Sequence, residues 1–136
     1  MQPINQQQTA DYVRLLTLAY RAAHAANPSV IIIQAGLSPT GVHNADADDD
    51  AEYMAWLFQA GLKSGVNYDV LGAHGNTQAT CVACDFNSLP AFGDPSFYFR
   101  RIEQLRDVQV KFGDSDHQIW LLEFNWTSDT IHPNYA

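Results

Sequence analysis

The stretch HQIWLLEFNWTSD, residues 117–129, joins an apolar run to a carboxylate that lies between aromatic side chains. The apolar run extends from Gln118 to Glu123, and Phe124 and Trp126 follow it. A run this short and this apolar predicts a buried β-strand. A carboxylate at the end of such a strand costs free energy unless it has partners or a chemical role. Glu123 is therefore the first candidate for a functional residue.

The N-terminal half of the chain predicts a helix, a strand and a second helix. Residues 9–28 place apolar side chains at helical spacing, and Thr9 could cap the start of this helix. The β-branched run at 29–36 predicts a buried strand. A second helix is expected to start near Asp49, because Asp49 and Glu52 have the spacing of a capping box.

The C-terminal half repeats the alternation of strand and helix. Residues 68–74 predict a second strand, residues 97–113 predict a third helix that ends at Gly113, and the opening stretch supplies the third strand. Apolar strands separated by helices predict an α/β fold with a parallel sheet and right-handed crossovers. No linker divides the chain, so residues 1–136 are interpreted as a single domain.

Polar side chains gather where the predicted strands end. The second strand ends at His74, with Asn76 two residues later, and the third ends at Glu123. Ligands of parallel α/β proteins lie at the C-terminal ends of the strands. We therefore expect the carboxylate of Glu123 and the ring of His74 to lie at one edge, within reach of a direct or water-bridged contact. A hydrogen-bonded core histidine is the alternative for His74.

Composition excludes several classes of partner. Hydrophobic residues make up 46% of the chain and charged residues 16%, which is typical of a globular domain. The formal net charge of −8 leaves no basic surface for nucleic acid or for anionic lipid. No apolar run approaches the roughly 20 residues of a membrane-spanning helix. We therefore expect neither nucleic-acid binding nor membrane insertion.

Other sequence features favour neither a metal nor a cofactor. The acidic run Asp46–Asp50 lacks the alternating ligands of an EF-hand and is interpreted as a solvated loop before a helix. Cys81 and Cys84 form a single CxxC, too few ligands for zinc, so a local disulfide or two idle thiols are expected. The stretch Gly36–Gly41 lacks the Lys and Ser/Thr of a phosphate loop.

The stretch WLLEFNWTSD at 120–129 resembles the seventh-strand motif of the clan A glycoside hydrolases, especially the cellulase and β-xylosidase families of that clan. Residues 12–41 resemble the fourth helix and fifth strand of those barrels, residues 68–74 the sixth strand, and residues 97–129 the sixth helix and seventh strand. The resemblance implies a partial (β/α)8 TIM barrel, with three sequential parallel strands and helices on one face.

The resemblance also implies roles for individual residues. Glu123 corresponds to the catalytic nucleophile of a retaining hydrolase that cleaves β-linked polysaccharides or oligosaccharides. His74, Trp126 and Asn76 are expected to contact the carbohydrate, and His74 can orient the nucleophile. Asn125 stands where the motif usually has Gly. No cofactor or metal is implied.

The acid/base Glu of the clan follows the fourth strand, and the chain contains no matching Asn-Glu-Pro motif. A TIM barrel needs about 250 residues, so the chain is interpreted as a fragment whose partners include the missing barrel strands. The full-length protein is expected to be extracellular or on the cell surface. Two alternatives stay open: a noncatalytic carbohydrate-binding or scaffold relative of the barrel, and a small α/β domain that binds another ligand.

Overall fold

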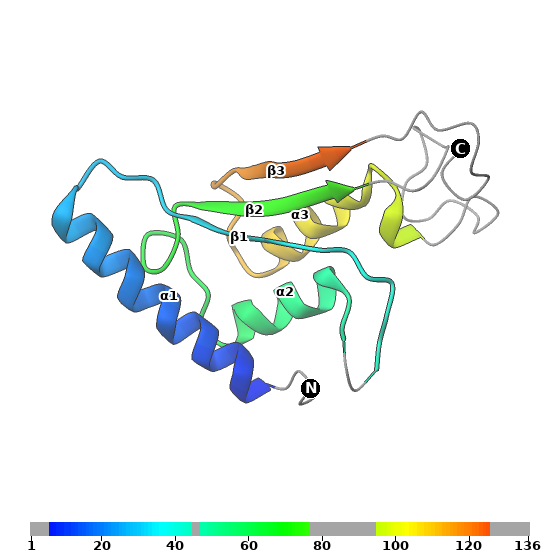
Figure 1. Cartoon of the computed structure of the whole chain (residues 1–136), viewed down its shortest axis with the longest axis horizontal. Coiled ribbons are helices and arrows are strands. Elements are labelled where there is room, and N and C mark those ends of the chain that lie inside the picture. The colour runs from blue at the N-terminus through cyan, green and yellow to red at the C-terminus, as the bar shows by residue number, and fades with distance from the viewer. Residues whose placement is uncertain (1–5, 45–46, 77–94, 126–136) are drawn as a thin grey trace.

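The computed structural model describes residues 6–44, 47–76 and 95–125. Helices and strands alternate along these residues (Figure 1). In chain order the elements are α1 (Gln6–Ala26), β1 (Ile33–Leu37), α2 (Asp50–Gln59), β2 (Val70–Asn76), the 3-10 helix η2 (Pro95–Phe97), α3 (Arg101–Lys111) and β3 (Ile119–Asn125).

The three strands form one open parallel sheet in the order β1-β2-β3. β2 lies in the centre and β1 and β3 lie at the edges, so neighbours in sequence are neighbours in the sheet (Figure 1). The predicted α/β class with three sequential parallel strands is therefore confirmed. The C-terminal ends of all three strands point to the same edge of the sheet, because the strands are parallel.

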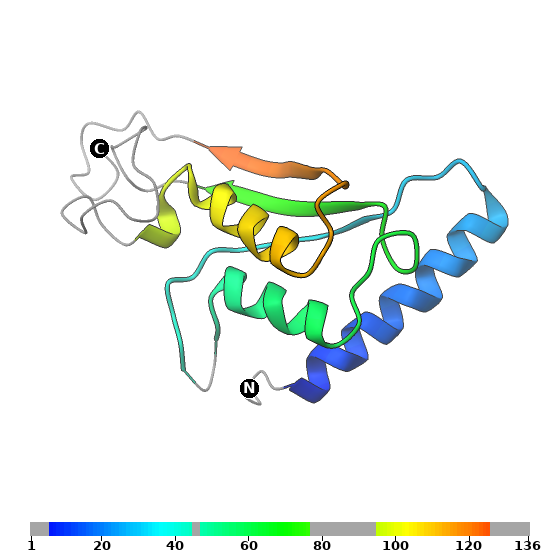
Figure 2. The ribbon, with the colours of Figure 1, turned by 180° about the vertical axis from the view of Figure 1, so that it is seen from behind.

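One hydrophobic core joins the helices to the sheet. It contains Val13 of α1, Leu57 of α2, Leu105 of α3, and Leu71 and Ala73 of β2. Figure 2 shows α3 in front of the strands with α2 beside it, and α1 packs against α2. The helices thus pack against the face of β2 that carries Leu71 and Ala73, as the one-sided apolar stripes of the helices predict.

The opposite face of the sheet is bare in the described part of the chain (Figure 1). On this face, Trp120 and Leu122 of β3 are 39% and 44% exposed. Phe124, which pairs with Gly75 and therefore lies on the face that carries Ala73, is 71% exposed. The prediction that β3 is a buried strand is therefore wrong for these residues. The reason is that β3 is an edge strand: no described element covers the face of Trp120 and Leu122, and Phe124, near the end of the strand, lies outside the hydrophobic core.

The first strand is shorter than its apolar run predicts, and it begins at Ile33 instead of Ser29. The backbone of Ile32 bonds mainly to Asp69, although its carbonyl also accepts the N–H of Val70, the first residue of β2, at 3.3 Å. The N–H of Ile32 donates to Asp69 Oδ2 at 2.8 Å, and its carbonyl accepts the N–H of Asp69 at 2.8 Å. Asp69 also accepts Tyr20 Oη at 2.8 Å and lies 3.1 Å from His24 Nε2, so it ties the end of α1 to the sheet.

The capping interactions predicted at the starts of two helices do not form. Thr9 lies inside α1 and is buried, because the helix already begins at Gln6. Asp49 occupies the N-cap position of α2, but its side chain makes no cap hydrogen bond and the capping box with Glu52 does not form. The carboxylate of Asp49 is used elsewhere, where it pairs with the buried guanidinium of Arg101.

The third helix starts later than predicted. Residues before Arg101 make i→i−3 hydrogen bonds, from Tyr98 N to Pro95 O and from Arg101 N to Tyr98 O, which belong to 3-10 turns. Regular α-helix follows from Arg101. The predicted end is confirmed: Gly113 follows the helix with a φ of 84°, a left-handed value that favours glycine.

None of the described helices combines the length and the apolar character that crossing a membrane requires.

Candidate functional site

Glu123 and His74 meet at the C-terminal edge of the sheet. The two residues are paired in the register of β2 and β3. His74 Nδ1 lies 3.7 Å from Glu123 Oε2, which confirms the predicted proximity of the two side chains. The histidine side chain is 16% exposed and the glutamate side chain is 60% exposed. The histidine is thus held by the protein, while the carboxylate is open to solvent.

An irregularity in strand pairing brings these two residues together. Ala73 pairs with Leu121, whereas the next residue of β2, His74, pairs with Glu123. Leu122 is therefore the extra residue of a β-bulge. Bulges beside active sites change the direction of a side chain, and this bulge turns Glu123 toward His74.

Gly36 of β1 supports the ring of His74. A Cβ atom at Gly36 would lie 2.4 Å from His74 Cδ2 and 2.5 Å from His74 Nε2, closer than two such atoms can approach. Only glycine therefore lets the imidazole lie over β1. His74 Nδ1 is buried and makes no hydrogen bond with a described residue, which leaves it directed at the carboxylate of Glu123 from slightly beyond hydrogen-bond distance.

The other predicted site residues fall at or outside the limits of the described residues. Asn76 ends β2 opposite Asn125, so its backbone lies at the same edge as Glu123. Trp126, Cys81 and Cys84 lie outside the described residues. The contact of Trp126 with carbohydrate, and the expected disulfide or idle thiols of Cys81 and Cys84, therefore stay predictions.

Sequence reasoning missed the apolar side chains that lie on the bare face of the sheet. Trp120 pairs with Gly72, and Leu122 Cδ1 would lie 2.7 Å from a Cβ atom at Gly72. Leu122 therefore occupies space that Gly72 leaves open. The alternation of β3 could have indicated this face, because Trp120 and Leu122 share a strand face, but the apolar residue between them hid the pattern.

A salt bridge holds the segments that surround the edge. Arg101 is buried and bonds to both Asp49 and Asp50. Asp49 also accepts the backbone N–H groups of Thr40 and Gly41 at 3.4 and 3.3 Å. Burial raises the pKa of Asp49, but Arg101 and these N–H groups outweigh it, so this pKa lies below its usual range. The segment after β1 is thereby fixed to the start of α3.

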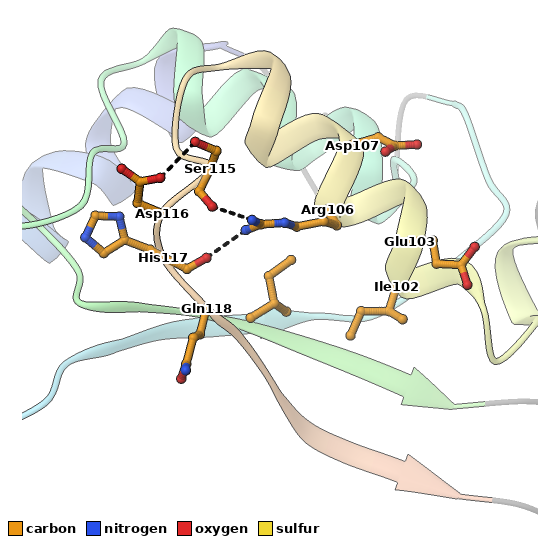
Figure 3. A pocket seen from close by; sticks show the side chains of 9 residues that line it. Ile102, Glu103, Arg106, Asp107, Ser115, Asp116, His117 and Gln118 are labelled. Carbon is orange, nitrogen blue, oxygen red and sulfur yellow. Dashed lines mark hydrogen bonds between the residues drawn. The ribbon is translucent and has the colours of Figure 1, made fainter.

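A surface hollow of about 680 Å³ lies at the other end of β3 (Figure 3). Ile102, Ile119 and Arg106 are among its lining residues. Arg106 reaches across it and donates to the carbonyl oxygens of His117, at 2.7 Å, and Ser115 (Figure 3). The guanidinium of Arg106 fixes the turn before β3, which gives the hollow a structural explanation. The hollow also lies about 13 Å from Glu123 along the strand.

The arrangement at the edge supports a specific range of chemistry. An exposed carboxylate beside an imidazole can act as a nucleophile or as a base, or it can bind a cation. The partly buried histidine can donate or accept a hydrogen bond, and so can hold one carboxylate oxygen in place.

Comparisons of the chain with models of protein families, with curated proteins and with solved structures found no match.

Proposed function

We propose that this chain is part of the catalytic barrel of a retaining glycoside hydrolase, with Glu123 as the nucleophile. The observation that carries the proposal is an exposed carboxylate at the C-terminal end of a parallel strand, 3.7 Å from the imidazole of the neighbouring strand. The resemblance of the WLLEFNW stretch to the seventh-strand motif of the clan A enzymes supports the same role.

The proposed reaction has two steps. A carboxylate oxygen of Glu123 attacks the anomeric carbon, and the bond from that carbon to the leaving oxygen breaks as the oxygen receives a proton. Water then attacks the anomeric carbon of the resulting ester, which releases the sugar with its original configuration and regenerates the carboxylate. The exposure of Glu123 leaves room for a sugar, and His74 orients the attacking oxygen.

The proton for the leaving oxygen needs a second carboxyl group about 5 Å from Glu123. Among the described glutamates other than Glu123, Glu52 of α2 pairs with His43 and Glu103 of α3 pairs with Arg100, so both already have partners. The proposal therefore assigns the acid/base to a longer polypeptide that completes the barrel.

The sheet is suited to such completion. The strands are parallel and sequential, the helices pack on one face, and the apolar side chains of Trp120 and Leu122 lie on the other. In a closed barrel, side chains of that second face fill the interior in layers. The exposed apolar groups would then form part of the barrel core.

Kinetic measurements test the role of Glu123. In the longer polypeptide, we expect Glu123→Gln to lower kcat on aryl β-glycosides by at least about a thousandfold, because an amide cannot replace the attacking carboxylate. Azide should restore turnover to Glu123→Ala and yield a glycosyl azide of inverted configuration. The 136-residue chain alone should release no nitrophenol.

Glu103→Gln serves as the matched control, since Glu103 is an exposed glutamate in the first turn of α3. It should leave kcat unchanged. Full activity of Glu123→Gln would refute the nucleophile. Sugar binding without turnover by the unaltered longer polypeptide would favour the noncatalytic carbohydrate-binding alternative.

A further inference from the structure

A second cluster of polar side chains lies apart from Glu123 and His74. It consists of His43 and Asp48, from the segment between β1 and α2, and Glu52, from the first turn of α2. One nitrogen or oxygen atom from each of the three side chains lies within 4.8 Å of the other two. His43 Nδ1 is 3.1 Å from Asp48 Oδ1 and 2.9 Å from Glu52 Oε2.

Hydrogen bonding accounts for only part of this convergence. His43 Nδ1 carries at most one proton, so it can donate fully to one of the two carboxylates. The other carboxylate is attracted to a protonated ring without a full hydrogen bond, and it lies beside a like charge, which is unfavourable. A cation placed among the three groups would replace the missing hydrogen bond and offset the repulsion between the carboxylates, because each group would then contribute a lone pair to it.

The surrounding structure holds two of the three groups in place. The side chain of Asp48 is 11% exposed, and its backbone carbonyl accepts Thr40 Oγ1 at 2.9 Å. The segment that carries His43 is closed by two hydrogen bonds between Asn44 and Ala47: Asn44 N donates to Ala47 O, and Ala47 N donates to Asn44 Oδ1. Glu52 lies in the first turn of α2, which fixes its backbone, so binding an ion requires adjustment of only the exposed side chains of Glu52 and His43.

The distances suit a transition-metal ion. Around an ion with bonds of about 2.1 Å to nitrogen and oxygen, octahedral ligands lie about 3.0 Å apart and tetrahedral ligands about 3.4 Å apart. The separations of 2.9 and 3.1 Å from His43 Nδ1 agree with the octahedral spacing. We propose that His43 Nδ1 and the carboxylates of Asp48 and Glu52 bind one divalent first-row transition-metal ion.

The donor set narrows the choice of ion. An imidazole nitrogen with two carboxylates suits zinc, cobalt or manganese, whereas calcium and magnesium prefer oxygen ligands alone. The ion would join the segment after β1 to the first turn of α2, and so fix one side of the C-terminal edge of the sheet. This role does not depend on the glycosidase proposal, because no ligand of the ion belongs to the Glu123 site.

Binding of Co²⁺ and Zn²⁺ tests the site directly. We expect the 136-residue chain to bind one Co²⁺, detected by visible absorption, and Zn²⁺ to displace it. His43→Ala, Asp48→Asn and Glu52→Gln should each weaken binding by at least about tenfold. Glu103→Gln, the matching glutamate in the first turn of α3, should bind as the unaltered chain does.

A second measurement needs no variant. Zn²⁺ should protect His43 from acylation by diethyl pyrocarbonate, while His24 and His117, which are partly exposed, should react at unchanged rates. The proposal would be overturned by the absence of stoichiometric Co²⁺ binding, by binding that survives His43→Ala, or by equal protection of all three histidines.

Discussion

Gln34 buries a side-chain amide in an environment that offers it no hydrogen bond among the described residues. It is fully buried, and neither Nε2 nor Oε1 has a hydrogen-bond partner in the part of the chain that the structure describes. Its pairing with Leu71 directs the side chain toward the helices and their hydrophobic core. A buried amide without a partner costs about 1–3 kcal/mol, so this single residue works against the stability of the sheet.

Replacing Gln34 by an apolar residue of similar size should therefore stabilise the fold. We expect Gln34→Leu to raise the free energy of unfolding by about 1–2 kcal/mol, since the cost of burying the amide is removed. Urea denaturation followed by circular dichroism measures the change.

Gln109→Leu is a matched control, because Gln109 is equally buried but its Nε2 donates to Asp114 Oδ2 at 2.8 Å. That variant should be less stable than the unaltered chain. If Gln34→Leu loses as much stability as Gln109→Leu, then the amide of Gln34 has a partner and the interpretation is wrong.

The glutamate and histidine of the candidate site were predictable because of a rule about parallel sheets, namely that strand ends share one edge. The supporting details were not. Gly36 under the imidazole and the bulge that turns Glu123 both depend on how neighbouring strands pair. The sequence did not indicate His43 as a ligand, because its carboxylate partners lie five and nine residues away. That spacing brings the three side chains together only because α2 begins at Asp50.

At the scale of elements, the turn between α3 and β3 depends on Asp114. Its buried carboxylate accepts hydrogen bonds from Tyr68, from Ser64 Oγ at 3.0 Å and from Gln109 Nε2 at 2.8 Å, and it lies 2.5 Å from His117 Nδ1. Burial raises the pKa of Asp114, but these hydrogen bonds outweigh it, so the pKa lies below its usual range.

A lowered pKa in the folded state makes the stability depend on pH. Because the unfolded carboxyl titrates near about 4, Asp114 contributes its full stability above that pH and loses it as pH falls toward the lower pKa of the folded state. We expect Asp114→Asn to cost about 2–3 kcal/mol at pH 7 and to flatten the loss of stability below pH 4. Urea denaturation across this pH range measures both effects.

Asp116→Asn is the control for this prediction, since Asp116 is exposed two residues away. It should change stability by no more than about 0.5 kcal/mol. An unchanged pH profile in Asp114→Asn would show that another group, such as Asp69, carries the acid dependence.

The order and type of the elements followed from apolar periodicity, whereas their limits did not. The run before Ile33 was predicted as strand, but Asp69 takes the backbone groups of Ile32. The start of α3 was predicted too early, because the residues before Arg101 form 3-10 turns. At β1 a polar side chain from a distant segment sets the limit, and local sequence carries no information about that partner; element limits are in any case less certain than element types.

At the scale of the whole molecule, the sheet has one covered face and one bare face. The bare face carries Trp120 and Leu122, and β3 presents an unpaired strand edge within the described part of the chain. An apolar face next to an open strand edge favours pairing with another polypeptide. In the proposed barrel, the remaining strands would both cover this apolar face and pair with the open edge of β3.

The 136-residue chain should therefore associate with itself when it is studied alone. We expect its weight-average mass in sedimentation equilibrium to rise with concentration, because burying Trp120, Leu122 and the edge of β3 lowers the free energy. Leu122→Lys should shift the association to at least about tenfold higher concentration, since a charged group cannot be buried there without cost. Leu18→Lys, on the exposed side of α1, should have a smaller effect, because Leu18 lies away from any strand edge. A monomer at every concentration, or equal effects of the two lysine variants, would show that the bare face does not drive association.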